Sequence, residues 1–422
     1  MRDEMKKVPR LRFRGFQEDW ELCKVGDFGR EIYGGGTPKT SVKEFWSGTL
    51  PWIQSSDLKE DKVCDIKAKK HISVKAIQQS SAKKISKNSI AIVTRVSVGK
   101  LVLMPYEYAT SQDFLSISVL QVDKWFGVYS LYNKLQSELN SVQGTSIKGI
   151  TKDELLNKKI MIPKPLKEQS KIGLFLKKID TTIALHQRKL EQLKEFKKAY
   201  LQVMFPEKDE RVPKLRFADF EEEWEHRKLD DSIKVMDGDR GANYPHDTDF
   251  FKDGDTLFLD TGNVTKNGFK FDSVKYITNE KDEQLRAGKL EKNDFVLTSR
   301  GTLGNVGFYD EVVYNLHPKI RINSAMLILR NTDEQLSYSY LHTLLKGQLI
   351  SDFMKKNQVG SAQPHITKSE FLKLNLNVPR NINEQNKIGN FFKSLDVTIT
   401  LHQNKLTQLK SLKKSYLQNM FI

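Results

Sequence analysis

A stretch of 39 residues occurs twice in this chain, and it constrains the fold more than any other feature. Residues 168–206 and 384–422 lie 216 positions apart and are identical at 25 of 39 positions. Both copies open with EQ, continue through KIG, and carry LHQ near their middle. A period of about 200 residues indicates a duplicated domain, because solenoid repeats are about 20–50 residues long.

Two further segments repeat outside these stretches. VPRLRFRGFQEDWE (8–21) returns as VPKLRFADFEEEWE (212–225), and GTSIKGITKDELL (144–156) returns as GSAQPHITKSEFL (360–372). The offset between the copies is still about 205 after residue 94 and is 216 from residue 144 onward. The extra residues of the second copy therefore fall opposite positions 100–144 of the first.

Between these anchors the copies differ strongly, as 31–58 and 234–264 show. Plain duplication with drift is the alternative, but drift would not spare a surface-rich helix while erasing the globular parts. A shared scaffold with different globular parts suits a molecule that holds two related modules, each of which reads something different. We predict four parts: a globular domain (1–167), a central helix (168–206), a second globular domain (207–383) and a C-terminal helix (384–422).

Each globular domain mixes strands and helices, which gives an α+β fold class. Short apolar runs bounded by turn residues predict strands at 89–95, 114–122, 294–300 and 325–330. Apolar residues at three- and four-residue spacing predict helices over 128–142 and 338–356. Thr151 and Thr367 stand three residues before Glu154 and Glu370, which is the spacing of a capping box at a helix start.

The two long helices show the alternating spacing of a coiled-coil seam, and each would be roughly 55 Å long. We expect them to pair with each other in antiparallel fashion, with the two globular domains at opposite ends. His186 and His402 would then face each other as a register-fixing polar pair; the alternative is a partly solvated histidine bonded to Gln187 or Gln403. The predicted pairing residues are Ile179, Ile183, His186, Leu190, Leu193, Leu395, Ile399, His402, Leu406 and Leu409.

Composition narrows the class of protein. The net charge is +16, from 69 Lys and Arg against 53 Asp and Glu, and a basic surplus favours polyanionic partners, although a soluble protein of high pI is the alternative. The surplus lies in the first domain (29 against 18) and in the two long helices (8 against 4 and 6 against 2), while the second domain is slightly acidic (26 against 29). Two cysteines support neither a disulfide framework nor a zinc site. With no secretory or membrane segment, we expect a cytoplasmic, metal-free protein.

Motifs of enzymes that act on nucleotides or esters are absent. The chain has no GxxxxGK[ST], GxSxG or HExxH, and no tetrapeptide typical of amino-methyltransferases. The glycine run at 33–38 indicates a turn or, alternatively, a close approach of the backbone to a phosphate. Catalysis by this chain alone is therefore not expected.

Three repeated features together resemble the DNA-specificity subunit of Type I restriction-modification systems. They are the openings (VPxLRFxxFxxxWE), the segments that close each domain (144–173 and 360–389) and the duplicated helices. Two divergent stretches look like the entries of two target-recognition-domain types. The first is the run from GGTP to DL (35–58), and the second is DGDRGANYP (237–245) with GDTLFLDTGNV (254–264). The resemblance covers essentially the whole chain.

The resemblance implies a non-catalytic DNA-recognition subunit. Each globular domain would read one half of a split, asymmetric site on double-stranded DNA, and the helices would set the gap and dock two methyltransferase subunits. S-adenosylmethionine, ATP and Mg²⁺ would be bound by the methyltransferase and the restriction and translocase subunits, and none by this chain. The alternatives are a stand-alone DNA-binding regulator and an enzyme with an unrecognised nuclease or methyltransferase site.

Candidate DNA contacts are polar and basic loop residues, which could read base edges or hold phosphates; each could equally be a solvated turn residue. In the first domain they are Thr37, Lys39, Arg95, Ser97, Lys100, Ser111, Gln112, Thr145, Ser146 and Lys148. In the second they are Arg240, Asn243, Tyr244, Arg300, Thr302, Asn305, Gln363 and His365. Arg95 and Arg300 end equivalent strands in dissimilar domains, which favours a shared role in positioning phosphates.

Overall fold

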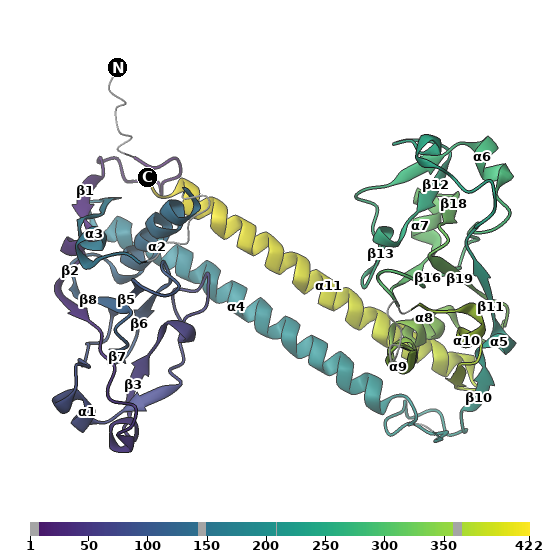
Figure 1. Cartoon of the computed structure of the whole chain (residues 1–422), viewed down its shortest axis with the longest axis horizontal. Coiled ribbons are helices and arrows are strands. Elements are labelled where there is room, and N and C mark those ends of the chain that lie inside the picture. Colours follow the sequence, from purple (N-terminus) through teal and green to yellow (C-terminus); the bar gives the residue numbers. More distant parts are fainter. Residues whose placement is uncertain (1–7, 142–148, 208, 358–364) are drawn as a thin grey trace. The chain divides into compact units, whose positions relative to one another are not determined.

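The structure is a computed structural model that describes residues 8–141, 149–207, 209–357 and 365–422 (Figure 1). It divides into two compact units: unit 1 is Met1–Lys189 with His402–Ile422, and unit 2 is Leu190–Leu401. Both long helices, α4 (Leu166–Val203) and α11 (Ile382–Asn419), contribute to both units. Within the described residues, no helix combines the length and apolar composition needed to cross a membrane.

Unit 1 is built on a four-stranded antiparallel sheet in the order β2-β8-β5-β6, a three-stranded sheet in the order β4-β3-β7, and the pair β1-β9. The strands are β1 (Glu21–Lys24), β2 (Gly29–Gly34), β3 (Leu50–Ile53), β4 (Lys70–Ile72), β5 (Ser89–Val93), β6 (Leu101–Met104), β7 (Ala109–Thr110), β8 (Phe114–Leu120) and β9 (Lys159–Ile162). The helices besides α4 are α1 (Val74–Gln79), α2 (Lys124–Ser141) and α3 (Lys152–Asn157).

Unit 2 repeats this plan with the sheets β11-β19-β16-β17, β15-β12-β18 and β10-β20, and adds the hairpin β13-β14. Its strands are β10 (Glu225–Lys228), β11 (Ile233–Asp237), β12 (Thr256–Leu259), β13 (Val264–Thr265), β14 (Gly268–Phe269), β15 (Lys275–Ile277), β16 (Phe295–Thr298), β17 (Val306–Phe308), β18 (Ile320–Ile322), β19 (Met326–Asn331) and β20 (Asn375–Val378). Its helices besides α11 are α5 (Leu229–Ser232), α6 (Asn279–Gln284), α7 (Glu311–Leu316), α8 (Tyr338–Lys346), α9 (Gln348–Asn357) and α10 (Lys368–Phe371).

The predicted α+β class, with two related domains and two long helices, is confirmed. The four predicted strands correspond to β5, β8, β16 and β19, and Thr151 forms the predicted capping box with Glu154. Extra residues of the second copy include α7, which joins β17 to β18; the same connection in unit 1 is residues 105–108. A single helix over 338–356 was the wrong expectation, because α8 ends at Lys346 and Gly347 leaves the helical conformation before α9 begins.

The repeated EQ at the start of each long helix attaches that helix to its unit. In unit 1 the Glu168 carboxylate accepts two hydrogen bonds from Arg12, of the opening VPRLRF, at 2.7 and 2.9 Å. Gln169 accepts from the Asp123 amide at 2.9 Å and donates to the Pro163 carbonyl at 2.8 Å. Both side chains are buried, so full pairing offsets the cost of removing them from water.

Unit 2 repeats these contacts, because Arg216 donates twice to Glu384 and Gln385 bonds the Ser337 amide and the Pro379 carbonyl. The glycine of KIG serves the same packing. A Cβ on Gly173 would lie 2.4 Å from Phe126 N, and a Cβ on Gly389 would lie 2.4 Å from Ser339 C. Each long helix therefore keeps a glycine in its interior, despite a cost of about 0.5–1 kcal/mol, since only glycine admits the neighbouring helix.

The two long helices pair in antiparallel fashion, as predicted. In unit 1 the Phe175 and Tyr416 rings lie 4.8 Å apart, and further along α4 the His186 Nδ1 lies 3.0 Å from His402 Nδ1. From Phe175 to His186 along α4, the contacting residue of α11 changes from Tyr416 to His402, so the two helices run in opposite directions. In unit 2 the Tyr200 and Phe391 rings, 5.1 Å apart, continue the same order.

The globular part of unit 1 packs on the C-terminal end of α11, and the globular part of unit 2 packs on the C-terminal end of α4. The core of unit 1 includes Trp20, Phe126 and the C-terminal residues Leu417, Met420 and Phe421. In unit 2 the matching core includes Met204, with Phe205 packed against it, both directly after the end of α4. All ten predicted pairing residues are buried or half-buried, with Ile179, Leu190, Ile399 and Leu406 buried.

Candidate nucleic-acid interface

In unit 2 the predicted arginines gather at one edge, where β11 and β16 end and β19 begins. The amides of Ser299 and Arg300 both donate to the Ala325 carbonyl, at 2.9 and 3.2 Å. From the loop after β11, Arg240 donates to the neighbouring Ser324 carbonyl and to Asp237, each at 3.2 Å. Arg240 and Arg300 are both exposed, so this strand-end edge presents two guanidinium groups to solvent.

The loop after β16 adds further predicted residues to this edge. Thr302 is exposed, and Gly301 and Gly304 on either side adopt positive φ values of 68° and 79°, which favour glycine. His365 is exposed and joins the edge because the next residue, Ile366, donates its amide to the Ser299 carbonyl at 2.9 Å. Gln363 lies outside the described residues.

Unit 1 forms the corresponding edge from β2, β5 and β8. Thr94 donates its amide to the Asp113 carbonyl at 2.8 Å, and Ile150 donates to the Thr94 carbonyl at 2.8 Å, which matches the contact of Ile366 with Ser299. The loop after β2 reaches the same place through a hydrogen bond from Gly36 N to Thr110 O, at 2.9 Å. The exposed predicted residues at this edge are Arg95, Ser97 and Gln112, with Thr37 half-buried. Lys39 is exposed further along the loop after β2, where its carbonyl accepts a hydrogen bond from the Trp46 indole at 3.2 Å. Thr145, Ser146 and Lys148 lie outside the described residues.

Four predicted contacts are engaged by other residues of the protein, and two of them, Asn305 and Ser111, are buried. Asn305 is buried and donates its amide to the Val264 carbonyl at 2.9 Å, so it fastens β13 to the loop before β17 instead of facing solvent. Ser111 is buried and donates to Asp113. Tyr244 is half-buried with its ring against Phe258, 5.9 Å between centroids. Asn243 stays exposed, but its amide donates to the Gln284 carbonyl at 3.3 Å.

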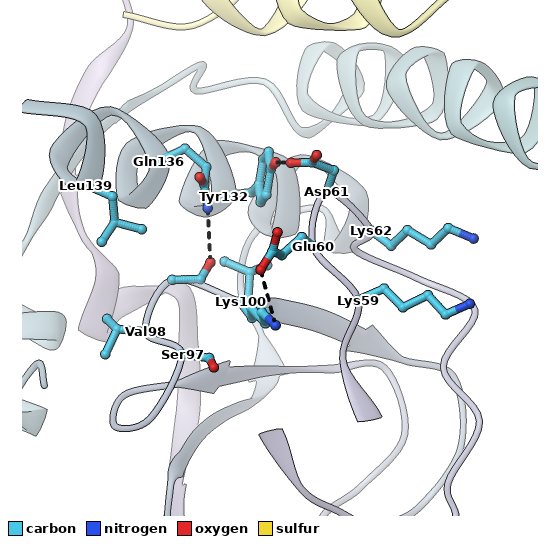
Figure 2. Close-up of a pocket in the computed structure, with 12 residues that line it drawn as sticks. Lys59, Glu60, Asp61, Lys62, Ser97, Val98, Lys100, Tyr132, Gln136 and Leu139 are labelled. Carbon is cyan, nitrogen blue, oxygen red and sulfur yellow. Dashed lines mark hydrogen bonds and ion pairs between the residues drawn. The ribbon is translucent and has the colours of Figure 1, made fainter. Parts of the chain in front are cut away.

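A pocket of about 280 Å³ opens beside the β5–β6 loop of unit 1 (Figure 2). It is lined by the 59–62 loop, the 97–101 loop and one side of α2. Lys100, only 21% exposed, lies 3.6 Å from the Glu60 carboxylate, and Tyr132 of α2 donates to Asp61 at 2.7 Å. Lys100 is therefore half-buried and paired with an exposed acidic side chain, which reduces the positive charge that it presents.

Lys59 and Lys62 are basic residues near the candidate interface that sequence reasoning missed. Both are exposed, and in Figure 2 their amino groups extend away from the pocket. They belong to KEDK (59–62), where two lysines flank two acidic residues, and this balanced charge gave no signal that the lysines would lie close to the loop after β5. The first domain thus carries two exposed cations beside this loop in addition to the predicted residues.

Both cysteines of the chain are partly buried, which weakens them as nucleophiles. Burial, reinforced by Asp27 and Glu21, raises the pKa of the Cys23 thiol to about 11, and burial beside Asp65 raises that of Cys64 to about 12. Both thiols are therefore protonated at neutral pH, and a thiol is a much weaker nucleophile than a thiolate. Among the described residues, no group of three His, Cys, Asp or Glu side chains could hold a metal ion.

Comparison with known proteins identifies the family. A family model described as "Type I restriction modification DNA specificity domain" matches residues 17–195 and again residues 221–411. The MjaIX specificity subunit of the Type I restriction enzyme of Methanocaldococcus jannaschii is 26% identical over 389 residues, 83% of this chain and 85% of the relative. The MjaVIII specificity subunit of the same organism is 22% identical over 94% of this chain and 91% of the relative.

Solved structures agree on the fold. The S subunit of a Type I restriction-modification system from M. genitalium matches with a TM-score of 0.64 at 15% identity, over 98% of this chain and 99% of that one. A chain from a structural study of complex assembly in a type I R-M system matches with a TM-score of 0.51 at 14% identity, over 94% and 96% of the two chains.

Proposed function

The chain belongs to the family of Type I restriction-modification DNA specificity proteins, and from this premise we propose that it reads a split DNA site, one half with each unit. Its role in the restriction-modification system is DNA recognition, and it is not a catalytic subunit. The two family matches, one per copy, agree with two reading modules. The single observation that carries the split-site proposal is the strand-end edge, which recurs with the same framework and different loops in units 1 and 2.

Within each edge, the residues that recur in both units and the residues that differ would have different roles in DNA binding. Arg95 and Arg300 follow equivalent strands, and a residue that is the same in two readers cannot distinguish their targets. These arginines would bind phosphates and fix the register on the duplex. The surrounding exposed side chains, which differ between units, would contact base edges in the major groove. Because the units differ there, the full site would not be palindromic.

The long helices would set the distance between the half-sites and dock two methyltransferase subunits. A helix of 38 residues is about 57 Å long, more than one DNA turn of about 34–36 Å. Apolar side chains at equivalent positions of the two helices are exposed: Leu185 by 62% and Leu401 by 63%, then Phe196 by 56% and Leu412 by 45%. Since the pattern occurs twice, we infer two copies of one partner.

The remaining chemistry would belong to those partners in the cytoplasm. Methyltransferase subunits would bind S-adenosylmethionine, and restriction and translocase subunits would use ATP and Mg²⁺. A stand-alone regulator is the rival function, and it should bind one operator tightly without any partner.

The test is to exchange residues 31–160 for the equivalent segment of a relative and to assemble the chain with its methyltransferase subunits. The methylated sequences would be read from a library of randomised duplexes. We expect one half of the recognised site to change and the other half and the gap to stay constant. Equal methylation of all duplexes by the unmodified complex, or a change in both halves after the exchange, would contradict the proposal.

A further inference from the structure

The residue directly after β12 stands at the strand-end edge of unit 2. β12 ends at Leu259, whose carbonyl accepts a hydrogen bond from the Asn323 amide at 3.0 Å. Asn323 is followed by Ser324, the residue whose carbonyl Arg240 contacts. The residue after Leu259 is Asp260, and it is exposed. A carboxylate therefore lies on the surface that the arginine loops share.

The turn that carries Asp260 is held rigidly. Asp260 Oδ1 accepts the Gly262 amide at 2.7 Å, and the Asp260 amide donates to Asn263 Oδ1 at 3.1 Å. Asn263 is buried, and its amide nitrogen donates to two backbone carbonyls, at 3.0 and 2.8 Å. The next residue, Thr261, places its Oγ1 3.9 Å from where a Cβ on Gly301 would stand, so the turn adjoins the loop of Arg300 and Thr302.

Gln54 takes the same position in unit 1. β3 ends at Ile53, whose carbonyl accepts the Ser111 amide at 2.9 Å. Gln54 starts a turn of the same design, in which its amide donates to the Asp57 carboxylate at 3.1 Å, as the Asp260 amide donates to Asn263. Gln54 is half-buried, and its side-chain nitrogen donates to Ser56 at 3.0 Å. One position of the common framework thus holds an amide in one unit and a carboxylate in the other.

Physical chemistry limits what an exposed carboxylate can do beside DNA. It repels phosphates, and it can only accept hydrogen bonds. In the major groove the donors are the exocyclic amino groups, N4 of cytosine and N6 of adenine. A glutamine side chain has both a donor and an acceptor, which matches the N6 and N7 atoms of adenine.

Resting on the proposed function, we propose that Asp260 and Gln54 are specificity-determining residues for their respective half-sites. Asp260 accepts a hydrogen bond from an exocyclic base amino group, through the oxygen that the Gly262 amide does not use. Gln54 pairs with the edge of one base in the other half-site. The rigid turns hold both side chains in place before DNA arrives, which lowers the ordering cost of binding.

The experiment uses the full chain assembled with its methyltransferase subunits. Asp260→Asn retains one oxygen to accept the Gly262 amide and replaces the other with an NH₂ donor. The complex would methylate a library of duplexes with randomised positions, with S-adenosylmethionine supplied, and the methylated molecules would be sequenced. We expect discrimination to fall about tenfold or more at one position of the unit 2 half-site, with the unit 1 half-site unchanged.

Asp253→Asn is the matched control, because it makes the same charge change at an exposed position before β12. Gln54→Glu is the reciprocal test and should alter one position of the unit 1 half-site only. The inference would be overturned if Asp260→Asn and Gln54→Glu both left the base preference unchanged. Equal losses of preference in the two half-sites, or the same change in Asp253→Asn, would also overturn it. Absence of any sequence preference in the unmodified complex would instead overturn the proposed function.

Discussion

Lys413 Nζ lies 2.6 Å from Asp180 Oδ1, and this ion pair is nearly buried, with 9% and 11% of the two side chains exposed. Tyr129 donates its hydroxyl to the other Asp180 oxygen at 2.7 Å, and the Lys413 ammonium also contacts the Asp61 carbonyl at 3.2 Å. The contacts join α11, α4, α2 and the 59–62 loop. The repeat supplies a second example in unit 2, where Lys197 pairs with Asp396 at 2.5 Å, with 22% and 35% exposed.

Removing Lys413 should therefore cost far more than removing Lys197. Lys413→Ala leaves the Asp180 carboxylate buried without its cation, which typically costs about 3–5 kcal/mol. Lys197→Ala breaks a pair that water already reaches, and exposed pairs contribute about 1 kcal/mol or less. Urea unfolding with tryptophan fluorescence would measure both. Equal losses of unfolding free energy in the two variants would contradict the prediction. The double variant Lys413→Met with Asp180→Leu should recover most of the lost free energy, since no charge remains buried.

His342 gives unit 2 a pH-dependent stability. Burial, reinforced by the nearby positive charge of Lys346, lowers the pKa of this imidazole to about 4. The ring lies against Phe295 and Phe308, with centroids 5.7 and 5.6 Å away. The unfolded chain binds the proton near pH 6.5 and the folded protein only near pH 4, so the contribution is complete above pH 6.5 and is lost as pH falls.

Between pH 6.5 and about 4, this group should reduce the free energy of unfolding by up to about 1.4 kcal/mol per pH unit. His342→Phe keeps an aromatic ring among the neighbouring phenylalanines and cannot bind a proton. The difference in unfolding free energy between variant and unmodified protein should grow in favour of the variant as pH falls from 7 to 5. Parallel curves over that range would show that His342 is not the responsible group.

The long-range pairing was predictable where the sequence repeats itself. His186 and His402 face each other because the seam spacing and the duplication both place them at equivalent positions. Local signals also sufficed for the cap at Thr151. The burial of Asn305 was not predictable, because a sequence offset cannot show that its side-chain amide meets the Val264 carbonyl, 41 residues away. The turns of Gln54 and Asp260 were missed for a related reason, since their place depends on parallel pairing of β3 with β7 and β12 with β18.

Arg95 and Arg300 should contribute to affinity without contributing to sequence preference. Each follows the equivalent strand of its unit and is exposed at the strand-end edge. Replacing either by alanine should weaken binding to all duplexes and reduce the slope of log K against log salt by about 0.9, the value for one phosphate contact. The methylated sequence should stay the same. Gln112→Ala, at an exposed and uncharged position of the same edge, should leave the salt slope unchanged. A lost base preference in Arg95→Ala would instead assign that arginine to base reading.

A half chain of residues 1–206 should form a symmetric homodimer. Unit 1 needs a second helix end, because Met420 and Phe421 belong to its core and the Phe421 ring lies 5.6 Å from Phe126. The half chain carries the same two residue types at Met204 and Phe205, within YLQVMF (200–205), where the C-terminal copy has YLQNMF (416–421). The α4 end of one copy can therefore fill the core of the other.

Light scattering after size-exclusion chromatography should give twice the mass of the half chain, and the dimer should methylate a palindromic site when assembled with methyltransferase subunits. Phe205→Glu would place a charge in that core and should give monomers or loss of folding, whereas Glu195→Gln, at an exposed position of the same helix, should leave the dimer intact. A folded monomer of the unmodified half chain would contradict the prediction, because it would mean that the core of unit 1 is stable without a second helix.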